Sequence, residues 1–171
     1  MALKTKELVL FSLLGAIMFA SKMITEALPN IHLLAMFIIS YTVVFRRKAL
    51  IPIFLFIFIT GAVYGFGIWW FPYLYLWPLL WGIVMLLPKR MPDKIATPVY
   101  MIVAGLHGLL YGTLYAPFQA LVHGLDFNGM ILWIIAGLQF DIIHGVSNFF
   151  VALFTVPVIK ALKLSAKSIA L

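Results

Sequence analysis

The sequence predicts an all-α, polytopic membrane protein whose single domain, residues 1–171, contains six transmembrane helices. Hydrophobic residues make up 65% of the chain and charged residues only 10%, and the mean hydropathy is +1.13. Soluble domains carry charge on about 25% of their residues, so this composition points to lipid as the main solvent. Apolar segments separated by short loops, and basic residues confined to every second loop, complete the prediction.

The apolar segments follow one another with few residues between them. We place them at residues 7–28, 32–45, 49–64, 72–87, 98–118 and 129–162. Pro29 and Asn30 end the first segment, a basic triplet ends the second, Gly65 and Gly67 end the third, and Pro88 ends the fourth. A helix needs about 20 residues to cross a bilayer, so the second and fourth segments are short. We expect them to use flanking residues or to cross a locally thin region.

Basic residues define the predicted orientation. Eleven of the twelve Lys and Arg residues lie near the chain ends, at 46–48 or at 89–94, and the loops 29–31, 65–72 and 119–128 have none. Cytoplasmic loops are enriched in Lys and Arg, so both termini are predicted to be cytoplasmic. The exception is Lys22, inside the first segment. The net charge of +7 therefore indicates membrane topology, with lipid as the partner, and predicts no nucleic-acid partner.

Two motif classes are missing from the sequence. The chain has no cysteine, which excludes a disulfide framework and a thiolate metal site. It also has no glycine-rich loop followed by Lys and Ser/Thr, the motif that cradles nucleotide phosphates. We expect no cofactor and no bound metal.

The last segment carries polar residues where apolar ones are expected. Asp141, His144 and Asn148 are spaced by three and four residues and so share one helical face. One interpretation is a hydrogen-bonding cluster that locks neighbouring helices together. The other is a ligand or proton site, because ionisable groups inside membranes are costly and tend to be functional. A metal site is less favoured, since His107 is the only obvious further ligand.

Three polar residues lie near the predicted outer ends of the first two segments. Lys22 and Glu26 are four residues apart, and we favour a pair whose ends extend toward the surface over contact with a ligand. His32 begins the second segment beside Asn30. Such residues are usually caps or interface groups, and a contact in an outer cleft is the alternative.

Aromatic residues are concentrated in residues 65–82, which hold four of the five tryptophans. We expect Trp69 and Phe71 to anchor the helix at the outer membrane surface. A second group recurs at helical spacing along the fourth segment: Trp70, Tyr73, Trp77 and Trp81. The first three are predicted to line an outer cleft, and Trp81 to pack deeper in the bundle.

Small residues recur every four positions in the first segment, at Ser12, Ala16 and Ala20, with Gly15 beside them. This pattern lets another helix approach closely. The partner is either a helix of this chain or a helix of another protein.

The chain resembles the S-component, the substrate-binding membrane subunit, of energy-coupling factor (ECF) transporters. Ala16-x-x-x-Ala20 is similar to the motif by which that family docks its transmembrane coupling subunit. The run FDIIHGVSNFF, residues 140–150, is similar to the last helix of many S-components. The resemblance covers nearly the whole chain.

The resemblance implies a vitamin-uptake subunit in the bacterial cytoplasmic membrane that is not itself an enzyme. ATP would be hydrolysed by two partner ATPases, which join the chain through the coupling subunit. Ser12, Ala16 and Ala20 would face that subunit. The ligand site would lie toward the outer face, in the outer loops and helices four to six. The substrate-binding residues that we expect are Asn30, His32, Trp70, Tyr73, Trp77, Tyr115, Gln119, Trp133, Asp141 and His144.

Charge and shape suggest candidate substrates. The outer loops lack cations, which favours a substrate without a net carboxylate charge, and aromatic walls suit a broad, flat molecule. Cobalamin is the first expectation, and riboflavin, thiamine and a queuosine precursor are alternatives. A second class of function is a small intramembrane enzyme that uses Asp141, His144 and His107. A third is a structural or assembly subunit.

Overall fold

The computed structural model describes residues 4–28 and 30–168, and within these ranges the chain is helical and has no strand. The predicted all-α class is confirmed. Pro29, predicted to end the first segment, lies outside the described residues. The elements are α1 (Thr5–Ile24), α2 (Leu34–Phe45), η1 (Arg46–Ala49), α3 (Leu50–Tyr64), η2 (Ile68–Trp70), α4 (Tyr73–Leu86), α5 (Asp93–Leu109), α6 (Tyr111–His123), α7 (Phe127–Val151), η3 (Ala152–Phe154) and α8 (Thr155–Ser168).

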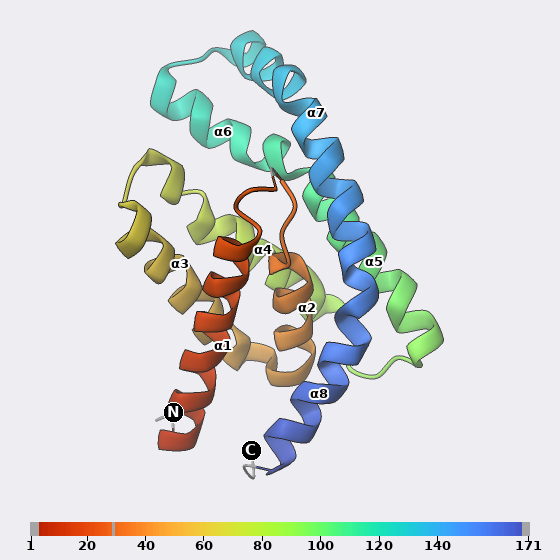
Figure 1. Cartoon of the computed structure of the whole chain (residues 1–171). Helices are drawn as coiled ribbons and strands as arrows, with labels where there is room; N and C mark the ends of the chain where they lie inside the picture. The colour runs from red at the N-terminus through yellow and green to blue at the C-terminus, as the bar shows by residue number, and fades with distance from the viewer. Residues whose placement is uncertain (1–3, 29, 169–171) are drawn as a thin grey trace.

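Successive apolar segments run in alternating directions along the bundle, with α8 continuing the course of α7, and the start of α1 and the end of α8 lie at the same end (Figure 1). Each predicted apolar segment coincides with one helix or with a pair of consecutive helices. The segment 98–118, predicted as one helix, is divided at Leu110 into α5 and α6. The physical reason comes from α7: Asp141 Oδ1 accepts the Gly112 N–H at 2.9 Å, and this bond draws the N–H away from regular helical pairing.

Four helical stretches are long and apolar enough to cross a membrane: Thr5–Ile24, Ile68–Leu86, Asp93–His123 and Phe127–Lys167. The remaining helices, α2 and α3, have 12 and 15 residues. Eight of the 12 residues of α2 are buried, because α1, α4, α5 and α8 pack around it. Protein rather than lipid therefore surrounds much of α2. Its buried hydroxyls bond within the helix, Ser40 to the Met36 carbonyl and Thr42 to that of Ile38.

Glycines set the closest helix contacts. On α5, a Cβ at Gly108 would lie 2.7 Å from the His144 carbonyl oxygen of α7. On α1, a Cβ at Gly15 would lie 2.8 Å from Leu55 Cδ2 of α3. Glycine at these positions lets the helix backbones approach closely, as small residues do in membrane bundles. Gly15 is therefore a point of close contact between α1 and α3.

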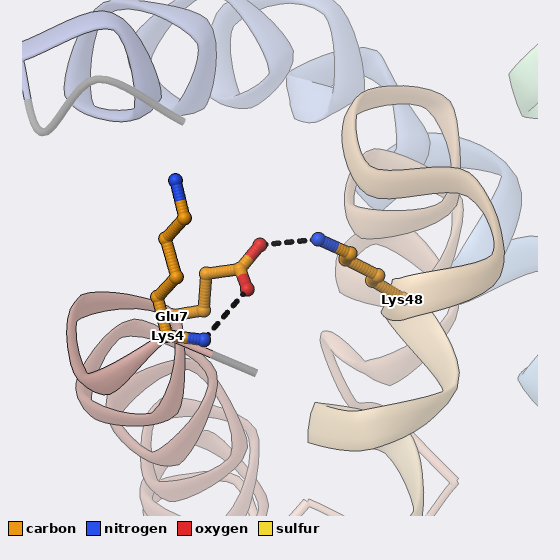
Figure 2. Close-up of polar contacts among 3 residues, drawn as sticks. All are labelled: Lys4, Glu7 and Lys48. Atoms are coloured by element: carbon orange, nitrogen blue, oxygen red, sulfur yellow. Dashed lines mark hydrogen bonds and ion pairs between the residues drawn. The ribbon is translucent and has the colours of Figure 1, made fainter. Parts of the chain in front are cut away.

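The basic stretches of the chain meet at the end of the bundle that holds the start of α1 and the end of α8 (Figure 1). There, Glu7 of α1 is 5% exposed and forms an ion pair with Lys48 of η1. Its other carboxylate oxygen accepts the Lys4 backbone N–H at 3.1 Å (Figure 2). A second ion pair joins Lys160 of α8 to Asp93 of α5. These contacts connect elements that carry much of the positive charge.

Candidate ligand-binding site

Two adjoining cavities lie at the opposite end of the bundle. The first, the histidine cavity, has a volume of about 220 Å³ and is lined by residues that include His32, Trp77 and His144. The second, the Trp133 cavity, has a volume of about 290 Å³ and is lined by residues that include Trp133. Asn30 and Tyr111 line both, so the two spaces are neighbours.

The cavities bring together nine of the ten residues that the sequence suggested for substrate binding. The histidine cavity is lined by Asn30, His32, Tyr73, Trp77 and His144. The Trp133 cavity is lined by Asn30, Tyr115, Gln119, Trp133 and Asp141. These residues come from four parts of the chain: the loop before α2 and the helices α4, α6 and α7. Their assignment to substrate binding stays a prediction.

Trp70 lines neither cavity, and the expectation that it faces the cleft is corrected. Its side chain is buried, and its Nε1 donates to the Ile57 carbonyl at 2.8 Å. Trp70 ends the short helix η2, and α4 begins only at Tyr73. The helical spacing that joined Trp70 to Tyr73 and Trp77 is therefore interrupted, and Trp70 packs against α3.

The other aromatic predictions have separate outcomes. Trp81 is partly buried against the hydrophobic core, as predicted, and its Nε1 donates to the Arg46 carbonyl at 3.0 Å. Phe71 is 47% exposed and stacks on Phe118 with ring centroids 6.1 Å apart. Trp69 is partly buried and contacts the Tyr73 ring. Membrane anchoring by Trp69 and Phe71 stays a prediction.

Closely packed rings build the wall of the histidine cavity. The centroids of His32 and His144 are 4.5 Å apart, and those of Tyr111 and His144 are 4.9 Å apart. Trp77 lies edge-on to His32 at 5.8 Å. This wall combines flat apolar faces with nitrogen atoms that can donate or accept hydrogen bonds.

Several buried polar atoms along this wall have no hydrogen-bond partner in the described part of the chain. They include His32 Nδ1, Trp77 Nε1 and His144 Nε2, and behind them both side-chain atoms of Asn148. Native proteins pair most buried polar groups, because each unpaired group costs about 1–3 kcal/mol. Unpaired atoms concentrated beside one cavity are the pattern expected of a site that bonds a polar ligand.

Lys22 and Glu26 both line the histidine cavity, which alters the expectation that they pair and point outward. No ion pair joins them within residues 4–28. Instead, Lys22 Nζ lies 4.1 Å from the centroid of the Tyr64 ring, and the Tyr64 hydroxyl donates to Glu26 Oε2 at 2.8 Å. Tyr64 thus holds a cation and an anion beside the same cavity.

The polar stripe of α7 divides into two kinds of residue. Asp141, His144 and Asn148 are all buried on one face, as predicted. Asp141 has a structural role because its carboxylate accepts the Gly112 N–H at the first turn of α6, where helices leave N–H groups unpaired. His144 and Asn148 have side-chain atoms without partners. The locking interpretation fits Asp141, and the ligand interpretation fits His144.

His107 lies behind the cavity wall and does not line either cavity. Its Nε2 is 3.1 Å from the Leu76 carbonyl oxygen, and its ring lies 5.8 Å from that of Trp77. No group of three or more His, Cys, Asp or Glu residues within 4–28 and 30–168 could hold a metal ion. The possible use of His107 as a metal ligand gains no support.

Tyr111 is the central residue that sequence reasoning missed. It lines both cavities, and its ring contacts those of His144, Trp77 and Tyr115. Its spacing of four residues from Tyr115, and of eight from Gln119, places all three on one helical face. That periodicity was a usable signal.

The small residues of α1 face outward. Ser12, Ala16 and Ala20 are exposed, whereas Gly15 makes the contact with α3. Packing within this chain therefore leaves the Ser12, Ala16 and Ala20 face available to another helix.

Comparisons with protein-family models, characterised proteins and solved structures found no match to this chain.

Proposed function

We propose that this chain is the substrate-binding membrane subunit of an ECF-type transporter for a vitamin or related micronutrient. The observation that carries the proposal is the histidine cavity, where buried polar atoms without partners line an aromatic wall. Apart from Lys22, which lines it, the cavity lies away from the basic residues of the chain. If those residues are cytoplasmic, the cavity faces the outside of the cell.

The proposal includes six membrane passes in the bacterial cytoplasmic membrane, with both termini cytoplasmic. The passes are α1, α2, α3, α4, α5–α6 and α7–α8, in agreement with the alternating directions of the helices (Figure 1). The short α2 can cross the membrane because neighbouring helices surround it, so that protein instead of lipid covers much of its surface. Cysteine-accessibility labelling of the loops 46–48 and 124–126 would test the orientation.

Ligand size favours the smaller candidates. Each cavity is below the range of about 300–1,000 Å³ that is typical of drug-sized ligands, and the two together fall within it. Cobalamin is a large macrocycle edged with amides and would need a much wider site. A flat ring system of the size of riboflavin, thiamine or a queuosine precursor fits better between Trp77, Tyr111 and Trp133.

The cavity could bind a ligand of either charge, because Lys22 and Glu26 both line it. An anionic group would be attracted to Lys22, and a cationic group to Glu26. The expectation of a ligand without a net carboxylate charge depends on the absence of cations from the outer loops. Because Lys22 lines the cavity, that expectation is weaker. Lys22→Gln should weaken binding of an anionic ligand and Glu26→Gln should strengthen it, with both signs reversed for a cationic ligand.

Calorimetry of the purified chain against a panel of vitamins tests the proposal. Trp77→Phe and Trp70→Phe form a matched pair of buried tryptophans. Trp77 Nε1 has no partner in the described chain, so Trp77→Phe should reduce ligand affinity about tenfold with little loss of stability. Trp70 Nε1 bonds Ile57, so Trp70→Phe should reduce stability by about 1 kcal/mol and leave affinity unchanged. Absence of binding across the panel would refute the proposed class.

The partners are proposed to be a transmembrane coupling subunit and two ATPases, which dock on the exposed small residues of α1. Ala16→Trp should reduce co-purification with the ATPases and preserve ligand binding. Leu132→Trp is the control, because Leu132 is also exposed but lies on α7. Equal co-purification of both variants would refute docking on this face. No observation supports an enzymatic role. Asp141, the carboxylate of the suggested enzyme site, accepts a hydrogen bond from the backbone of α6.

A further inference from the structure

A third cavity, which we call the basic cavity, lies at the opposite end from the proposed ligand site and has a volume of about 280 Å³. Four cations and one carboxylate line it: Lys89, Arg90, Lys160, Lys163 and Asp93. They come from the loop before α5, the first turn of α5, and α8. Segments that are far apart in the sequence therefore direct an excess of positive charge toward one space.

The floor of the basic cavity is apolar. Val156 and Ile159 of α8 and Ala96 of α5 are buried, and they line the cavity beneath the cations. A basic rim above an apolar floor suits a group that carries a negative charge on an apolar body.

Tyr100 gives an independent indication of a ligand. It lines the cavity, most of its side chain is buried, and its hydroxyl makes no hydrogen bond within residues 4–28 and 30–168. The hydroxyl itself is not sealed from solvent, so a group that enters the cavity can reach it. A phosphate oxygen could accept its hydrogen bond while the lysines and Arg90 neutralise the charge. Topology alone explains why cations occupy this end, but it does not explain why four of them line one cavity together with a tyrosine hydroxyl that is free to donate.

We propose that the basic cavity binds a phosphate group, supplied either by the headgroup of an anionic membrane lipid or by a soluble phosphate compound. One anionic partner already present is Asp93, which pairs with Lys160. Lys89, Arg90 and Lys163 form no ion pair within residues 4–28 and 30–168 and remain to face the phosphate. The site is separate from the histidine cavity and shares no lining residue with it.

The test measures thermal stabilisation of the full chain in uncharged detergent micelles. Phosphatidylglycerol is titrated in one arm, phosphatidylcholine in a second, and inorganic phosphate in a third. The variant Lys89→Gln/Lys163→Gln removes two cations of the cavity and keeps the Lys160–Asp93 pair. The control Lys6→Gln/Arg47→Gln removes two exposed cations from the same end of the bundle, outside the cavity.

Phosphatidylglycerol should raise the unfolding temperature of the wild type, and phosphatidylcholine should not. The half-saturating concentration should rise roughly 30-fold in Lys89→Gln/Lys163→Gln, from about fivefold per cation, and stay near the wild-type value in the control. Tyr100→Phe should raise it by a smaller factor without a change of charge. Stabilisation by phosphatidylglycerol alone identifies a lipid as the source, and stabilisation by inorganic phosphate as well identifies a soluble compound. Equal loss in both double variants, or no stabilisation by either anion, would overturn the proposal.

Discussion

Gly112 and Gly137 both line the Trp133 cavity, and replacing each with alanine separates a structural contact from simple filling of space. A Cβ at Gly112 would overlap Asp141 Oδ2 and lie 2.9 Å from Oδ1 and 3.0 Å from Cγ. A Cβ at Gly137 would have no neighbouring atom within 4 Å. Gly112→Ala therefore has to displace the carboxylate that accepts the Gly112 N–H, and Gly137→Ala displaces nothing.

The two variants are expected to change the free energy of unfolding differently. In Gly112→Ala, the lost hydrogen bond costs about 1–3 kcal/mol and insertion of the methyl group about 1–3 kcal/mol, and improved helix propensity returns about 1 kcal/mol. The net destabilisation is about 1–5 kcal/mol. Gly137→Ala retains only the propensity term and should be neutral or slightly stabilising.

The assay is thermal unfolding of both variants in one detergent, monitored by circular dichroism. For a chain of this length, 1 kcal/mol corresponds to about 2–4 °C in Tm. Gly112→Ala should also cost much less in an Asp141→Ala background, because the group it displaces is then missing. A Gly112→Ala protein that unfolds at the same temperature as Gly137→Ala would refute the role assigned to Asp141.

Three further predictions concern stability and local opening. Gly15→Val should lower Tm, at a cost of about 1–3 kcal/mol, because the new side chain meets Leu55. Ala16→Val on the exposed face should change stability by less than about 0.5 kcal/mol. Both variants are measured as the isolated chain. Glu7→Gln removes the ion pair with Lys48 and should lower Tm, and an unchanged Tm at low salt would contradict a stabilising pair. Ser147 Oγ donates to the Asn30 carbonyl at 3.0 Å, so Ser147→Ala should speed hydrogen exchange in the loop before α2 and leave the centre of α7 protected.

The predictions that succeeded depend on local sequence patterns. Apolar runs specify helices, and the spacing of Asp141, His144 and Asn148 specifies a shared face wherever those helices lie. The division of the sixth predicted segment into α7, η3 and α8, and of the fifth into α5 and α6, was not predicted. The break at Leu110 depends on a carboxylate from α7, 29 residues away in the chain from its partner Gly112.

The residues whose contacts were predicted wrongly show the same difference between local pattern and tertiary contact. Trp70 has the spacing of a cleft residue, but η2 ends before α4 begins, and its indole bonds α3 instead. Lys22 and Glu26 have the spacing of a helical pair, but Tyr64 of α3 holds both beside the cavity. In each case a residue from another helix decided the outcome.

By itself, the sequence determined the helical class, the approximate positions of the helices and the separation of basic from aromatic loops, because composition and periodicity act within a helix or a loop. Only the tertiary structure decided which side chains share a cavity, which buried polar atoms are paired, and which small residues of α1 face outward. Those properties depend on helix packing, where the partner of a side chain comes from a distant part of the chain.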